Sequence, residues 1–413
     1  MSDHTHVQRR TLRVLVLAQV VGAVGITIGI ATASLLARDL SGSDTMAGLA
    51  QTFQTFGTAA TAFALGALMG RRGRRPGLVG AYLTGALGAF LAVVAGVVES
   101  LPLLFVGTLL LGAVSAANAA SRYAATDLAT PETTARALSV VVWATTIGAV
   151  AGPNLTGPAA AFADQLGIPE LTGPFALGAV GMLTAALVVA VGLRPDPLLL
   201  ADGVRVAPAA DSTSSGRVGA ALRADPGLAA GMLAMAAAHA VMVSVMVMTP
   251  LHMEHGGSTL EVIGVVISVH VFGMFGFSPL VGAVADRFGR ATTIGCGALI
   301  LLVSLAVAGR SPMGTSSGIF LGLFLLGLGW SFATIGSSAV VADRAPHGMR
   351  TRVQGTSDSL MSLTAAGGSA LSGVIVGGWG YPALNLFAAL FALAVLAAAF
   401  VVRHSATAPA LPD

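Results

Sequence analysis

Long apolar runs, almost free of charge, are the feature that most restricts how this chain can fold. Twelve of them reach about 20 residues, the length that a helix needs to cross the hydrocarbon core of a bilayer. They are residues 14–36, 46–69, 77–97, 102–125, 138–160, 172–194, 227–250, 259–284, 291–309, 315–342, 353–378 and 382–402. The sequence therefore predicts an all-α membrane protein with twelve transmembrane helices, for which the lipid bilayer is the main partner.

The composition argues against several other classes of protein. Of the 413 residues, 55% are hydrophobic and 9% are charged, whereas charged residues make up about 25% of a soluble domain. Cys296 is the only cysteine, so the chain forms no internal disulfide. The first run, residues 14–36, is too long for the core of a cleaved signal peptide. The sequence contains no Gly-x-x-x-x-Gly-Lys loop, so we expect no direct use of ATP; we also expect no enzymatic activity and no bound cofactor.

The cations indicate how the chain is oriented in the membrane. All 21 of them are arginines. With the N-terminus inside, 19 lie in cytoplasmic segments, and only Arg38 and Arg310 lie in external loops. Because cytoplasmic loops carry an excess of positive charge, we predict a multi-pass protein of the cytoplasmic (inner) membrane with both termini cytoplasmic. This orientation explains the net charge of +3 without a nucleic-acid partner. We also expect no obligate protein partner.

The apolar runs fall into two halves, separated by a polar segment. That segment is rich in proline and charged residues and contains a Ser/Thr/Gly run at 212–216, which is typical of a linker. We predict a first bundle of six helices at residues 1–194, a cytoplasmic linker at 195–226 and a second bundle of six helices at 227–413.

The two halves repeat one another at an offset of 216 residues. Residues 66–75 read GALMGRRGRR, and residues 282–291 read GAVADRFGRA. The same offset carries Asp127 onto Asp343. Duplicated halves around a central site are a known plan of secondary transporters.

The first block resembles the signature that the major facilitator superfamily carries between its second and third helices, and the second block is its repeat. The resemblance covers essentially the whole chain and implies two pseudo-symmetric six-helix bundles. In that family an aspartate of the signature helps to latch one conformation; the second block has Asp286 there, whereas the first has Gly70. The resemblance assigns a gating role to Arg71, Gly73, Arg74, Asp286, Arg287 and Arg290. An equally good interpretation is that these arginines only set the orientation of the chain in the membrane through their positive charge.

Sulfur and imidazole groups gather in the seventh and eighth runs. Seven of the 14 methionines and four of the eight histidines lie between Met232 and Met274. In the eighth run, His270 and Met274 are four residues apart. Ordinary packing also explains such stripes, because methionine fills irregular gaps in a core, and His270 can be a structural histidine. At helical spacing, one face of the seventh run carries Met232, Met235, His239, Met242 and Met246.

Thioethers and neutral imidazole are ligands that suit Cu(I), and neither adds a charge to an empty site. The pair Met242-x-x-x-Met246 and His270-x-x-x-Met274 resembles the paired motif of the CcoA-type copper importers of the same superfamily. The resemblance implies that these four residues carry the copper, which is substrate and not cofactor. The stripe adds His239 and Met235 as further ligands, and we expect His252, Met253 and His255 to form a collection point at the external mouth.

We therefore predict a secondary active transporter that imports Cu(I) through a central cavity by alternating access. One alternative is proton-coupled export of small organic compounds, because Gly148-x-x-x-Gly152-Pro153 is similar to the fifth-helix motif of drug–proton antiporters. Close helix packing with a kink at Pro153 explains that motif as well. No predicted span has a central Asp or Glu, which weakens any mechanism with a buried proton-carrying carboxylate. A third possibility, a membrane sensor or assembly factor, predicts binding without flux.

Overall fold

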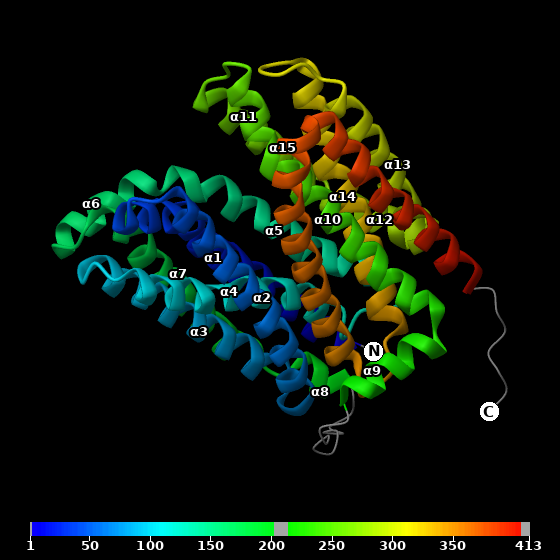
Figure 1. Ribbon diagram of the computed structural model, residues 1–413. Coiled ribbons are helices and arrows are strands. Elements are labelled where there is room, and N and C mark those ends of the chain that lie inside the picture. Colours follow the sequence, from blue (N-terminus) through cyan, green and yellow to red (C-terminus); the bar gives the residue numbers. More distant parts are fainter. Residues whose placement is uncertain (1, 202–213, 406–413) are drawn as a thin grey trace. The chain divides into compact units, whose positions relative to one another are not determined.

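The computed structural model describes residues 2–201 and 214–405, and these residues are helical almost throughout (Figure 1). The helices up to the predicted linker are α1 (Ser2–Ser41), α2 (Asp44–Arg72), α3 (Arg74–Val97), α4 (Leu101–Ala124), α5 (Thr134–Asn154), α6 (Thr156–Leu166) and α7 (Gly173–Gly192), with a short 3₁₀ helix η1 (Glu170–Thr172) before α7. Those that follow are α8 (Pro197–Ala201), α9 (Ser214–Ala224), α10 (Pro226–His255), α11 (Leu260–Phe275), α12 (Ser278–Phe288), α13 (Arg290–Gly309), α14 (Ser317–Arg344) and α15 (Arg350–Ser405).

The predicted all-helical membrane fold is confirmed. Eight stretches of the described residues are long and apolar enough to cross a membrane. The last of them, Arg350–Ser405, contains two of the predicted spans, because the helix bends at Gly380, whose φ is 80°. The predicted span at 259–284 is divided between α11 and α12, and Pro279 lies in the first turn of α12, where its missing N–H does no harm. Of the predicted linker, residues 202–213 lie outside the described residues.

The chain forms two compact units, and each unit is made of three separate segments of the chain. The first unit contains residues 1–129, 144–209 and 350–362, and the second contains residues 130–143, 210–349 and 363–413. Helices α5 and α15 therefore each contribute to both units. The predicted boundaries at 194 and 227 stay a prediction.

Each unit has its own packing (Figure 1). In the first unit α1 packs on α7, α2 on α4, and α3 on both α4 and α7. In the second unit α14 is central, with α10, α11 and α13 packed against it. Glycine permits this close approach: a Cβ atom on Gly327 of α14 would lie only 2.3 Å from the carbonyl oxygen of His270. Small residues at membrane-helix interfaces allow such backbone contact.

The repeat seen in the sequence returns in the backbone. Gly73 joins α2 to α3 with φ 90°, and Gly289, its repeat partner, joins α12 to α13 with φ 91°. Residues with a Cβ atom avoid this part of conformational space. The glycine in both signature blocks is therefore required by the turn itself, whatever part the neighbouring charges play.

Candidate functional site

The methionine stripe of α10 faces the interior of the second unit. Met235 is fully buried and Met242 is 4% exposed, while Met246 is half-buried. Met242 and Met274 belong to one hydrophobic cluster, and Met246 packs against it. Three of the four sulfur and nitrogen donors in the paired motif thus contribute to or touch the same core, where apolar packing alone also stabilises them.

His270 of α11 is completely buried, and its hydrogen bonding fixes its tautomer. Its Nδ1 lies 2.9 Å from the backbone carbonyl oxygen of Leu323 on α14. A carbonyl oxygen only accepts, so Nδ1 carries the proton, and the neutral ring keeps a lone pair on Nε2. Among the described residues, no protein group hydrogen-bonds this Nε2. Histidines that bind metals usually donate their other ring N–H to a carbonyl or carboxylate in this way.

His239 of α10 shows the opposite arrangement. Trp330 of α14 donates a hydrogen bond of 2.9 Å from its Nε1 to Nδ1 of His239. The lone pair on Nδ1 is therefore used, and in the neutral ring Nε2 holds the proton. In this conformation His239 offers no free donor to a metal. Trp330 also meets the ring of Phe275 edge-to-face at 5.7 Å, so it links α10 to α11, a role that no sequence motif indicated.

The structure connects the two motif helices through a third one. Helices α10 and α11 both pack extensively on α14 and contact one another little. Met235 of α10 also contacts α14, because its sulfur accepts a hydrogen bond of 3.5 Å from Ser338 of that helix. Within residues 2–201 and 214–405, no group of three or more His, Cys, Asp or Glu side chains is placed to hold a metal ion. Only a site that includes thioethers fits these donors.

The residues expected at the external mouth have different surroundings. His252 stacks on the ring of Tyr381 with 4.2 Å between centroids, and only 9% of it is exposed. Met253 is fully buried in the core cluster, whereas His255 at the end of α10 is exposed. Of the three residues, His255 alone is freely reachable from outside, and the collection role stays a prediction.

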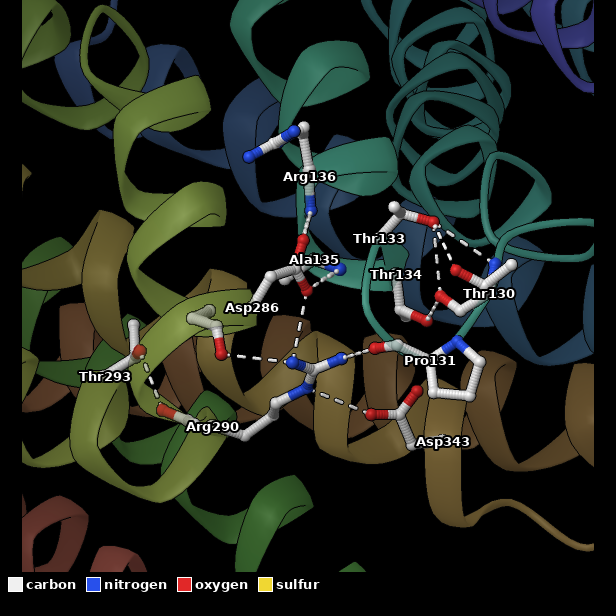
Figure 2. A network of polar contacts seen from close by, with 12 residues as sticks. Thr130, Pro131, Thr133, Thr134, Ala135, Arg136, Asp286, Arg290, Thr293 and Asp343 are labelled. Atoms are coloured by element: carbon white, nitrogen blue, oxygen red, sulfur yellow. Dashed lines mark hydrogen bonds and ion pairs between the residues drawn. The ribbon is translucent and has the colours of Figure 1, made fainter.

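The second signature block builds a polar network with the first turn of α5 (Figure 2). Asp286 accepts hydrogen bonds from the backbone N–H groups of Ala135, at 3.0 Å, and Arg136, at 2.9 Å. A carboxylate at a helix N-terminus satisfies unpaired N–H groups and interacts favourably with the helix dipole. Arg290 holds this carboxylate in place through an ion pair of 3.1 Å.

Arg290 also binds the loop before α5 and the end of α14. Its Nη2 donates to the carbonyl oxygen of Pro131 at 2.6 Å, and its Nε donates to Asp343 at 3.1 Å (Figure 2). On the same exposed loop, a hydrogen bond with Thr130 is the main cause that lowers the pKa of Glu132, and the nearby charge of Arg290 adds to it. Arg290 and Asp286 thus join α12, α13, the loop before α5 and the end of α14, and their gating role stays a prediction. Arg287 is exposed and lies outside this network.

The first block forms a related but different cluster. Arg74 donates to both carboxylate oxygens of Asp127, at 2.8 and 2.9 Å, and to the side-chain oxygen of Gln354 at 2.8 Å. Arg74 is 1% exposed, whereas Arg71 is exposed. Gly70 provides no carboxylate for the start of α15. The neutral Gln354, which belongs to α15, instead gives Arg74 its contact with that helix.

An ion pair that no sequence motif indicates lies in the same unit. Arg122, in the last turn of α4, bonds to Asp358 of α15, and the two side chains are 7% and 4% exposed. Both charges fall inside predicted spans, at 102–125 and 353–378. Buried charges inside membranes usually pair with one another. One arginine and one aspartate inside two separate apolar runs therefore indicate, from the sequence, that the two side chains form an ion pair.

Comparison with known proteins decides the family. The model of the Major Facilitator Superfamily matches residues 15–260 and 228–412. The chain belongs to the major facilitator superfamily. It is 38% identical over 393 residues to the uncharacterized MFS-type transporter YddS of Bacillus subtilis, covering 94% of this chain and 89% of that protein. Membership makes this chain a multi-pass membrane transporter of small solutes.

Two other transporters extend the comparison. The riboflavin transporter RfnT of Brucella anthropi is 30% identical over 396 residues, with 93% of both chains covered. The crystal structure of the human organic anion transporter MFSD10 matches 96% of this chain and 99% of that one, with a TM-score of 0.71 at 16% identity. The second likeness shows the shared fold alone.

Proposed function

We propose that this superfamily transporter imports Cu(I), with Met242, Met246, His270 and Met274 as the ligands that pass the ion through the membrane. The observation that carries the proposal is His270. Its ring is fully buried, its Nδ1 proton is fixed by Leu323, and its Nε2 lone pair has no partner among the described residues. Leaving such an acceptor unsatisfied costs free energy in an apolar core, which a bound cation recovers.

The neighbouring sulfur atoms support a soft cation. Met274 lies one turn from His270 and is 7% exposed, and Met242 is in the same core cluster. Thioether and imidazole together favour Cu(I) over the hard cations, which prefer oxygen ligands. His239 leaves the proposed ligand set, because Trp330 already uses its Nδ1.

A second candidate cargo is a flavin or another small planar heterocycle. The relative that favours it is RfnT, a riboflavin transporter at 30% identity over nearly the whole of both chains. For such a cargo, Trp330 and Phe275, which are in contact at 5.7 Å, would supply aromatic faces for stacking. The four motif residues would then serve packing alone.

A copper-uptake assay in cells separates these proposals. Cells that lack the protein should accumulate less copper, and wild-type protein should restore the level. Met242→Ala should fail to restore it, while Met248→Ala, which removes a half-buried methionine of α10 that packs against the same cluster but lies outside the motif, should succeed. Normal copper in the deleted cells, together with lost riboflavin uptake, would replace the copper proposal by the flavin one.

A further inference from the structure

Asp358 is a carboxylate buried inside the first unit, on a helix that belongs to a membrane-spanning stretch. It is 3% exposed and bonds to Arg122 of α4. Taking two charges out of water is expensive, and their attraction only partly offsets that cost. Ionisable groups inside membrane helices therefore mark functional sites more often than structural ones.

The surroundings of Asp358 hold few other charges. Helix α4 presents Arg122 and Tyr123, helix α3 presents Arg74, and α15 itself presents the neutral Gln354. Arg74 is already neutralised by Asp127 through two hydrogen bonds. The residues that α2 contributes to this cluster are apolar: Ala62, Leu65, Gly66 and Met69. Arg122 is thus the main group that keeps the Asp358 carboxylate ionised.

A small cavity adjoins Asp358. Its volume is about 10 Å³, and its polar lining comes from Arg74, Tyr123, Thr351, Gln354 and Asp358. A cavity of roughly 10–15 Å³ with two to four polar partners holds one water molecule. A water there has the hydrogen-bonding groups to pass a proton to the carboxylate.

We propose that Asp358 is a proton-binding site that couples transport to the proton gradient, with Arg122 as its switching partner; the inference takes its cargo from the proposed function. A hydronium ion gives its proton to one carboxylate oxygen, which leaves a water molecule and a neutral acid beside the guanidinium. The attraction that holds α15 to α4 then weakens. Because α15 continues from residue 362 of the first unit into residue 363 of the second, this binding event acts on a helix that both units share.

Infrared difference spectroscopy of the purified protein in vesicles tests the site without any cargo. Spectra recorded in acidic and alkaline buffer should differ by the carbonyl stretch of a protonated acid. The band should be present in wild type and in Asp225→Asn, a control that removes a partly exposed carboxylate from its ion pair with Arg344 and keeps an equally good helix cap. The double variant Arg122→Gln/Asp358→Asn should lose the part of the band that comes from this buried acid, whereas the bands of the other carboxyl groups remain. An unchanged band in the double variant overturns the proposal.

We use the double variant because Asp358→Asn alone leaves the buried charge of Arg122 without its counter-charge, which destabilises the fold itself. A second measurement is Cu(I) uptake by vesicles with an inward proton gradient. The gradient should accelerate uptake by wild type and by Asp225→Asn, and it should have no effect on the double variant. A gradient effect of equal size in the double variant contradicts the proposal. If wild type moves no Cu(I), the copper assignment fails, while the infrared result still decides the proton site.

Discussion

Arg74 donates hydrogen bonds to both carboxylate oxygens of Asp127, whereas Arg290 donates to only one oxygen of Asp343. Arg290 and Asp343 are the repeat partners of Arg74 and Asp127. The first pair is buried, with side chains 1% and 2% exposed; in the second, Asp343 is 34% exposed. The two halves therefore use the same pair of charges in different environments.

This difference predicts unequal costs of neutralisation. Asp127→Asn should lower the free energy of unfolding by about 3–5 kcal/mol, because it leaves Arg74 buried without its counter-charge. Asp343→Asn should cost about 1 kcal/mol or less, because the pair is partly exposed and Arg290 keeps its bonds to Asp286 and Pro131. Thermal unfolding of the detergent-solubilised variants measures both. An equal loss of stability in the two variants would show that burial does not decide how much each ion pair contributes to the fold.

The contact between α11 and α14 predicts a sensitive glycine. Gly327→Ala would bring a Cβ atom within 2.3 Å of the His270 carbonyl oxygen, so the helices must separate and the bond from His270 to Leu323 must lengthen. We expect a loss of about 1–3 kcal/mol, as is usual for overpacking. Gly264→Ala is the matched control on α11, because its Cβ would meet no atom within 4 Å. Unfolding temperatures that fall together would contradict this account.

Restoring an acid at Gly70 should strengthen the first block. By the repeat, Asp286 caps the N–H groups of Ala135 and Arg136, so an aspartate at position 70 should cap those of Thr351 and Arg352 at the start of α15. A Cβ on Gly70 lies 2.8 Å from Oγ1 of Thr351, so the test uses Gly70→Asp with Thr351→Ala. Relative to Thr351→Ala alone, stability should rise by about 0.3–1 kcal/mol, and turnover should slow because the added bonds must break in each cycle. Faster turnover would rule out a latch at this position.

Much of the fold follows from the sequence, because its causes are local. Runs of about 20 apolar residues specify spanning helices, and the repeated Gly-x-x-x-x-Arg-x-Gly-Arg string specifies the turns at Gly73 and Gly289. Where one run became two helices, as with α11 and α12, the break depends on a few residues around Pro279. The average hydrophobicity of the run is insensitive to these few residues, so it does not predict the break.

The site was less predictable, because its decisive contacts come from helices distant in sequence. The stripe on α10 was visible as a pattern, but its pairing with α14 was not. Trp330 and Leu323 determine which nitrogen of His239 and of His270 is available, and neither residue forms a motif with them. Likewise, Arg122 and Asp358 are 236 residues apart, and only the folded chain shows that they meet.

Uptake of Cu(I) by proteoliposomes that contain wild type or His270→Asn tests the central claim most directly. The asparagine amide can still donate to the Leu323 carbonyl, so the helix contact is kept while the Nε2 lone pair is removed. We expect wild type to accumulate copper and the variant to lose uptake by at least about tenfold, because even the partners that orient a metal ligand matter by 10–100-fold. Equal copper uptake by a folded His270→Asn protein and by wild type would contradict the account.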